Sequence, residues 1–225
     1  MNELALFAGA GGGLLASQYI GWRTVCAVEL DEHSRCVLIK RQNQRQLRHS
    51  FPIWDDVRSF DGRTWRGSID VVSGGFPCQA YSRAAAGKNT ADTLWPEMLR
   101  VVADVAPRYV FAENVQKEAI DHAADDLDAL GYKTRAIQLS AKDMGADHIR
   151  ERYWLLAYSD DTRELLCGFN AKAQELQSLA HSLWESNPGI SRVADGMAYR
   201  MDRLRETGNG QSPIVAIAAL VALCG

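Results

Sequence analysis

The stretch GGFPCQ at residues 74–79 contains the side chain best suited to covalent chemistry, the thiol of Cys78. Pro77 fixes its own backbone and restricts Phe76 before it, so the loop is predicted to be stiff. A thiol held in this way suits nucleophilic attack, because its thiolate is reactive although its ordinary pKa is about 8.5. The alternative is a small buried hydrophobe, which is what most free cysteines are.

A carboxyl group and two arginines are the next candidates. Glu113 follows the apolar run 107–112, so we expect it at the end of a strand adjacent to the strand that carries Cys78. Arg150 and Arg152 stand at alternate positions of an extended segment and therefore project to the same side. They could face a phosphate or support a carboxylate such as Glu113. A surface ion pair is the alternative for both.

A glycine-rich turn, GAGGG at residues 9–13, follows the apolar run 3–8 and precedes a helical pattern over 14–20. Strand, glycine turn and helix in this order open a nucleotide-binding unit. Glu29 falls about twenty residues later at the end of another predicted strand, where a carboxylate accepts both hydroxyls of a ribose. The alternative for Glu29 is a solvated carboxylate, the usual state of this residue type.

The elements that position these residues alternate between strands and helices. This alternation predicts an α/β fold with a mostly parallel, twisted sheet and helices on both faces. Asp31 is the predicted N-cap of the second helix. The predicted strands cover 3–8, 24–29, 51–57, 69–73, 107–112, 132–139 and 153–158, and the predicted later helices cover 94–105, the segment after Val115, and 214–223.

The composition is that of an ordinary globular chain of 225 residues, with 47% apolar and 24% charged residues. The net charge of −3 argues against a generally basic nucleic-acid binder, so any DNA contact must come from a local patch. Five cysteines without a Cys-x-x-Cys pair favour a reduced protein without a zinc site. We expect no signal peptide, and the apolar run 214–224 is too short to span a bilayer.

These stretches resemble the motifs of the DNA cytosine-5 methyltransferase family, and they occur in the order typical of that family. The segments that carry the resemblance are LFAGAGG at 6–12, DV at 56–57, the cysteine loop at 74–79, ENV at 113–115, RER at 150–152 and GN at 208–209. The resemblance implies a Rossmann-like fold that depends on S-adenosylmethionine. The cofactor-binding residues that it implies are Phe7, Ala8, Gly9, Gly11, Gly12, Glu29, Leu30, Asp56, Val57, Pro77, Asn209 and Gly210.

The resemblance also implies roles in catalysis. Cys78 adds to carbon 6 of a flipped-out cytosine, Glu113 binds the ring nitrogen, and Arg152 with Arg150 holds the base carbonyl and Glu113. Asp56 would accept from the adenine amino group, with a turn-forming Asp pair as its alternative. The implied DNA contacts are Gln79, Ser82, Arg83 and Lys88, and a plain surface loop is the alternative for Lys88.

The resemblance predicts three regions: a catalytic domain over 1–158, a reduced target-recognition region over 159–191, and a C-terminal segment over 192–225 that returns to the catalytic domain. A recognition region of about thirty residues is too small for a core of its own. The expected partner is DNA, with no metal and no membrane, in the cytoplasm of a bacterium or encoded by a phage, as part of restriction–modification.

Three other functions stay open from the sequence. The first is a methyltransferase-like binding subunit that needs a second chain for DNA recognition. The second is methylation of RNA cytosine. The third is a nicotinamide oxidoreductase on the same nucleotide-binding fold, against which the Pro-Cys-Gln loop and the C-terminal Gly-Asn both argue.

Overall fold

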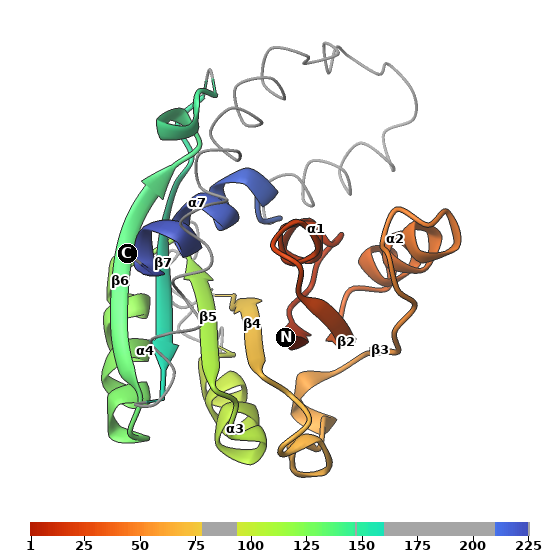
Figure 1. Ribbon diagram of the computed structural model, residues 1–225, viewed down its shortest axis with the longest axis horizontal. Coiled ribbons are helices and arrows are strands. Elements are labelled where there is room, and N and C mark those ends of the chain that lie inside the picture. Colours follow the sequence, from red (N-terminus) through yellow and green to blue (C-terminus); the bar gives the residue numbers. More distant parts are fainter. Residues whose placement is uncertain (78–93, 147, 160–209, 225) are drawn as a thin grey trace, which may run out of the picture.

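The computed structural model describes residues 1–77, 94–146, 148–159 and 210–224. Within these residues one seven-stranded sheet has the order β3-β2-β1-β4-β5-β7-β6 (Figure 1). The β1, β2, β3, β4 and β5 strands pair in parallel, whereas β7 runs antiparallel between β5 and β6. The strands are β1 (Asn2–Leu6), β2 (Arg23–Val28), β3 (Ile53–Trp54), β4 (Val71–Gly75), β5 (Tyr109–Asn114), β6 (Lys133–Ser140) and β7 (Glu151–Tyr158).

Helices cover both faces of the sheet. One face packs against α1, α2 and α7, and the other packs against α3 and α4. The helices are α1 (Gly12–Tyr19), α2 (Glu32–Asn43), α3 (Trp95–Val105), α4 (Lys117–Ala129) and α7 (Pro213–Cys224), with short 3-10 turns η1 (Val57–Ser59), η2 (Gly62–Trp65) and η3 (Lys142–Met144). The predicted α/β fold with helices on both faces is therefore confirmed.

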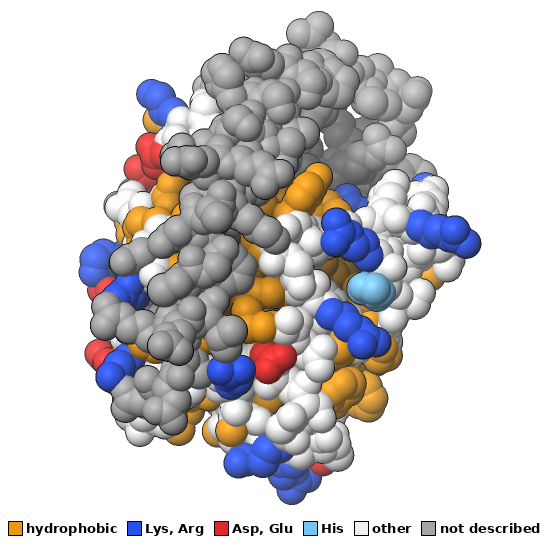
Figure 2. All heavy atoms as spheres, viewed as in Figure 1, with side chains coloured by type: hydrophobic (Ala, Val, Ile, Leu, Met, Phe, Trp, Pro, Cys, Tyr) orange, Lys and Arg blue, Asp and Glu red, His pale blue; other side chains and the backbone are white. Residues whose placement is uncertain are grey.

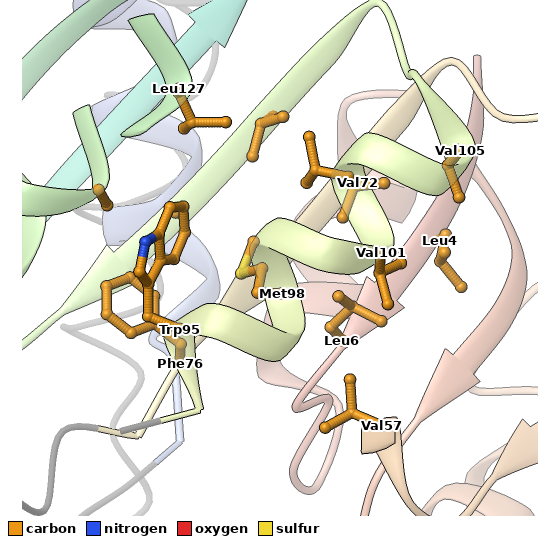
Figure 3. Packing of buried hydrophobic residues seen from close by; sticks show 14 of the residues in the cluster. Leu4, Leu6, Val57, Val72, Phe76, Trp95, Met98, Val101, Val105 and Leu127 are labelled. Atoms are coloured by element: carbon orange, nitrogen blue, oxygen red, sulfur yellow. The ribbon is translucent and has the colours of Figure 1, made fainter. Parts of the chain in front are cut away.

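The core under α3 shows why the apolar pattern of the sequence gives this packing. Met98 and Val101 lie on one side of α3 and contact the sheet beside Leu6 and Val72 (Figure 3). All four side chains are buried, and burying one such side chain stabilises the fold by roughly 1.5–3 kcal/mol. This packing against α3 holds β1 and β4 in place near their carboxyl ends.

Local signals placed most elements correctly, although several bounds differ: the strand predicted over 51–57 is only Ile53–Trp54, and the strand predicted from 153 begins at Glu151. Asp31 is the N-cap of α2, as predicted, and its carboxylate accepts from the backbone N–H of Ser34 at 2.9 Å. The strand before the cysteine loop continues through Gly74 and Gly75 instead of ending at Ser73. A Cβ at Gly74 would lie 2.6 Å from the Leu6 carbonyl oxygen, so a glycine lets β4 approach β1 this closely.

The C-terminal helix packs against another helix and against the sheet. α7 lies against α1 and over the β5, β7 and β6 half of the sheet (Figure 1). Of the predicted region 159–191 only residue 159 is described, and the predicted segment 192–225 is described over 210–224. None of the helices in the described part of the chain combines the length and apolar character needed to cross a membrane.

Candidate active site

The turn after β1 has the backbone of a ligand-binding loop. Phe7, Gly9 and Gly11 all have positive φ, at 53°, 53° and 90°. This conformation is costly for a bulky residue such as Phe7 and persists only where the surroundings impose it. Apart from Gly9 and its two chain neighbours, no atom of the described residues lies within 4 Å of the position that a Cβ at Gly9 would occupy, so these residues leave the turn open on that side.

Glu29 is held against this turn by two backbone donors. The N–H of Gly9 donates to Oε2 of Glu29 at 2.7 Å, and the N–H of Asp31 donates to Oε1 at 2.8 Å. A carboxylate offers about four acceptor sites, so both oxygens can still accept from a ligand. Leu30 beside it is 55% exposed and offers an apolar surface. Open turn, fixed carboxylate and exposed aliphatic side chain together fit a nucleoside with a free ribose.

Asp56 and Val57 have clear roles in the fold. Asp56 caps η1 by accepting from the N–H of Arg58 at 3.0 Å, and it forms an exposed ion pair with the Arg58 side chain. The Val57 side chain is buried beside Leu6 (Figure 3). Contact between Val57 and a ligand would therefore involve its backbone, and adenine recognition by Asp56 stays a prediction.

The cysteine loop is described as far as Pro77, and its base is fixed by Asn114. The Asn114 side-chain amide donates to the carbonyl of Phe76 at 2.9 Å and accepts from the N–H of Gln116 at 3.0 Å. The Phe76 ring packs against Trp95 with ring centroids 5.0 Å apart. Asn114 was not among the predicted site residues, although its place beside Glu113 at a strand end was a usable signal.

Glu113 lies directly beside this loop, because Gly75 of β4 and Glu113 of β5 are register partners. The predicted adjacency of the two strand ends is therefore confirmed. A Cβ at Gly75 would lie 2.5 Å from Oε2 of Glu113, so glycine leaves the room that the carboxyl group occupies. Glu113 itself is buried, with 6% of its surface exposed.

The predicted arginines reach this carboxyl group from β7. Nε of Arg152 lies 2.8 Å from Oε1 of Glu113, and both side chains are largely buried. Because β7 is antiparallel, its first residues lie at the edge of the sheet where β1, β4 and β5 end. Arg150 approaches Glu113 closely enough to influence its charge, and its Nη2 donates to the carbonyl of Gly210 at 2.6 Å.

Opposing influences act on the Glu113 carboxyl group. Burial raises its pKa, whereas the positive charges of Arg152 and Arg150 and a hydrogen bond from the Gln211 side chain lower it. Desolvation in turn lowers the pKa of the Arg150 guanidinium, and the neighbouring Arg152 charge lowers it further. A carboxyl group in this balance is suited to exchanging a proton with a ligand.

Gln211 lies in the site although it was not among the predicted site residues. Its backbone carbonyl contacts Gly12, and its side-chain oxygen contacts Gly13, so a Cβ at either position would collide with it. Its side-chain nitrogen lies 3.1 Å from the position of a Cβ at Gly75. The backbone of Gln211 leaves no room for a side chain at residue 12, which explains the glycine there. Contact between Gly12 and a cofactor stays a prediction.

Several predicted site residues lie outside the described residues: Cys78, Gln79, Ser82, Arg83, Lys88 and Asn209. On the face seen in Figure 2, the Lys and Arg side chains are spread over the surface and do not form one continuous basic patch. In the described part of the chain, no group of three or more His, Cys, Asp or Glu side chains could hold a metal ion.

Comparison with known proteins decides the family. The family model described as C-5 cytosine-specific DNA methylase matches residues 1–208. The chain belongs to this family. Among methylases of the type II class, M.NgoMIV of Neisseria gonorrhoeae is 30% identical over 173 residues, covering 71% of this chain and 52% of the relative. M.Eco47II of Escherichia coli is 37% identical over 120 residues, covering 50% of this chain and 27% of the relative.

Solved structures support the methylase fold. A variant of DNMT2 from Spodoptera frugiperda superposes with a TM-score of 0.59 at 18% identity, over 72% of this chain and 50% of that chain. At this identity the likeness concerns the fold alone. The chain spans about half the length of curated methylases such as M.NgoMIV and M.HhaI of Haemophilus parahaemolyticus.

Proposed function

We propose that this protein transfers a methyl group from S-adenosylmethionine to carbon 5 of cytosine in DNA. The observation that carries the proposal is the buried Glu113, which lies beside the strand leading to Cys78 and is paired with Arg152 at 2.8 Å. Membership of the cytosine-specific family and the type II relatives support the choice of base and of DNA as partner.

Residues at the end of β1 and β2 would hold the cofactor. Phe7, Ala8, Gly9 and Gly11 would surround its methionine end, and Glu29 would accept from the ribose hydroxyls. Leu30, Asp56 and the backbone of Val57 would surround the adenine. Pro77, Asn209 and Gly210 would close the pocket. The cofactor supplies an electrophilic methyl group on a sulfonium.

Cys78 would act as the nucleophile. A cytosine stacked in a duplex exposes neither face of its ring, so the base must be flipped out at a cost of a few kcal/mol. The Cys78 thiolate then forms a bond to carbon 6, which makes carbon 5 nucleophilic. After carbon 5 has accepted the methyl group, a base removes the carbon-5 proton and the bond between sulfur and carbon 6 breaks.

Glu113 would stabilise the negative charge that develops on the ring when Cys78 adds. Burial raises its pKa, which favours the protonated form that can donate to the ring nitrogen. Positioned acid catalysis of this kind contributes about 10²–10⁴ in rate. Arg152, with Arg150 behind it, would hold Glu113 in place and donate to the base carbonyl. Gln79, Ser82, Arg83 and Lys88 would contact the DNA.

The test is the variant Cys78→Ala with mixed-sequence DNA and labelled S-adenosylmethionine. We expect methylation to be abolished while calorimetry still detects cofactor binding, because the thiol takes part in the reaction and not in the cofactor pocket. Bisulfite sequencing of the product then locates the modified cytosines. Methylation by Cys78→Ala at the wild-type rate, or methylation at an adenine, would contradict the proposal.

A second candidate is a methyltransferase subunit that needs another chain for DNA recognition. The observation that favours it is the coverage of only about half of curated relatives such as M.NgoMIV. Methylation assays with the chain alone and with candidate partner chains separate the two functions. Activity of the purified chain alone would exclude the need for a partner.

A further inference from the structure

We propose that Gln211 is a positioning residue for Glu113, fixing the carboxyl group in one orientation and linking it to the glycine turn at the start of α1. The inference rests on the proposed function, since it concerns the group that would meet the cytosine ring. Gln211 lies outside all of the segments that carry the resemblance to the methyltransferase family.

Gln211 occupies a space bounded by three glycines on two separate elements. Gly12 and Gly13 begin α1, and Gly75 ends β4. At each of them a Cβ would press against Gln211, and at Gly75 it would also press against Glu113. These glycines therefore leave room for the backbone of residue 211 and for its whole side chain.

The backbone on both sides of Gln211 is anchored. Before it, Gly210 accepts from Nη2 of Arg150 at 2.6 Å, and the backbone N–H of Arg150 donates to the Ser140 hydroxyl at 3.1 Å. After it, the N–H of Ala216 donates to the carbonyl of Ser212 at 3.0 Å in the first turn of α7. A side chain between two fixed points holds its hydrogen bonds at a low entropic cost.

The side-chain amide of Gln211 is a neutral hydrogen-bond donor to Glu113, whereas a third cation would add a full positive charge beside it. It donates to the Glu113 carboxylate with its nitrogen while its oxygen lies against Gly13. In the described residues the charged groups that face Glu113 are Arg150, just before β7, and Arg152, within it. A neutral donor fixes the orientation of the carboxyl group without adding a full charge that would hold it ionised.

The first experiment titrates Glu113 directly, by NMR of the carboxyl carbon in protein labelled at glutamate. The variant Glu113→Gln assigns the signal. In Gln211→Leu the donor is lost, so we expect the pKa of Glu113 to rise, whereas Gln44→Leu at the exposed end of α2 should leave it unchanged. Gln211→Glu has nearly the native shape and should raise the pKa further, through repulsion between two carboxylates.

An unchanged Glu113 titration in both Gln211 variants would overturn the proposal. This readout needs no methylation, so it stays decisive even if the wild-type protein proves inactive and the proposed function fails. Thermal unfolding identifies a variant that does not fold, and Gln211→Glu then replaces Gln211→Leu because it fits the same space.

The second experiment separates kcat from KM at saturating DNA. A positioning role predicts that Gln211→Leu lowers kcat about 10- to 100-fold, a part of what a positioned acid contributes, while KM for S-adenosylmethionine changes less than about twofold. The alkaline limb of the pH–rate profile should also move to higher pH. A raised KM with unchanged kcat would make Gln211 a cofactor-binding residue and would contradict the proposal.

Discussion

Two carboxyl groups, Glu3 of β1 and Glu113 of β5, are buried in the same sheet but have different neighbours. Glu3 accepts hydrogen bonds from the hydroxyls of Ser17, Thr24 and Ser73 at 2.5, 2.7 and 2.6 Å. Glu113 instead faces two arginines and an amide. Burial raises the pKa of both groups.

The two sets of neighbours differ in whether they can form hydrogen bonds to both the protonated and the ionised carboxyl group. A hydroxyl can donate or accept, so the three hydroxyls satisfy Glu3 in either form. A guanidinium can only donate, so Arg152 favours the ionised form of Glu113 against the effect of burial. Glu3 lies within the sheet, whereas Glu113 lies at its edge beside the cysteine loop. We infer that Glu3 serves the fold and Glu113 the reaction.

The largest effect should come from Glu113→Gln. The amide keeps the shape of the side chain but cannot supply the proton of a carboxylic acid. We expect methylation to fall about 10²–10⁴-fold, with cofactor affinity retained, as measured by methyl transfer and calorimetry. Loss of cofactor binding in the same variant would mean that Glu113 supports the pocket and not the reaction.

Arg152→Met should lower the methylation rate less than Glu113→Gln does, but it should clearly lower the free energy of unfolding. Losing the cation raises the pKa of Glu113 in the folded protein, so the folded state holds the proton to higher pH than the unfolded chain, whose glutamates titrate near 4.3. Stability therefore falls as pH rises from about 4.3 through the folded value. We expect a loss of about 3 kcal/mol at pH 8 and less at pH 5, measured by urea unfolding.

Ser17→Ala tests the hydroxyl side of the comparison. It removes one of the donors to Glu3, so the free energy of unfolding should fall by about 1–2 kcal/mol at pH 7. Methylation should stay within about twofold of wild type, since Glu3 takes no part in the reaction. A loss of activity as large as that of Glu113→Gln would abolish the distinction between the two carboxyl groups.

Glu3→Gln should have the smallest effect and a characteristic dependence on pH. Because burial raises the pKa of Glu3, its contribution to wild-type stability is present below about pH 4.3 and is lost as pH rises through the folded pKa. The amide does not titrate, so the free energy of unfolding of the variant should differ from that of wild type by about 1 kcal/mol or less at pH 4. By pH 8 the variant should have become more stable relative to wild type. A parallel pair of stability curves would show that Glu3 has an ordinary pKa.

The sequence predicted features that depend on neighbours along the chain. The glycine turn, the Asp31 cap and the strand end at Glu113 all follow from local patterns. The pairing of Arg152 with Glu113 was one of three predicted possibilities, beside a phosphate contact and a surface ion pair, and the structure shows this largely buried pair. Cys78 and the proposed DNA contacts remain predictions, because they lie outside the described residues.

Other features could not be read from local patterns. Glu3 looks like any charged residue at the start of a strand until Ser17, Thr24 and Ser73 come together from three elements. Gln211 meets its three glycines only after the chain has returned to α1. In both cases a polar side chain is explained by close contacts between segments far apart in sequence, which periodicity does not report.

The direction of β7 has a consequence for how such sheets gather their functional groups. If β7 ran like its neighbours, residues 150 and 152 would fall on the opposite rim, roughly 25 Å from Glu113 for a strand of this length. Because β7 is reversed, residues at its beginning lie at the same rim of the sheet as residues at the ends of the parallel strands. A search for functional groups in related chains must therefore include the residues that lead into the reversed strand.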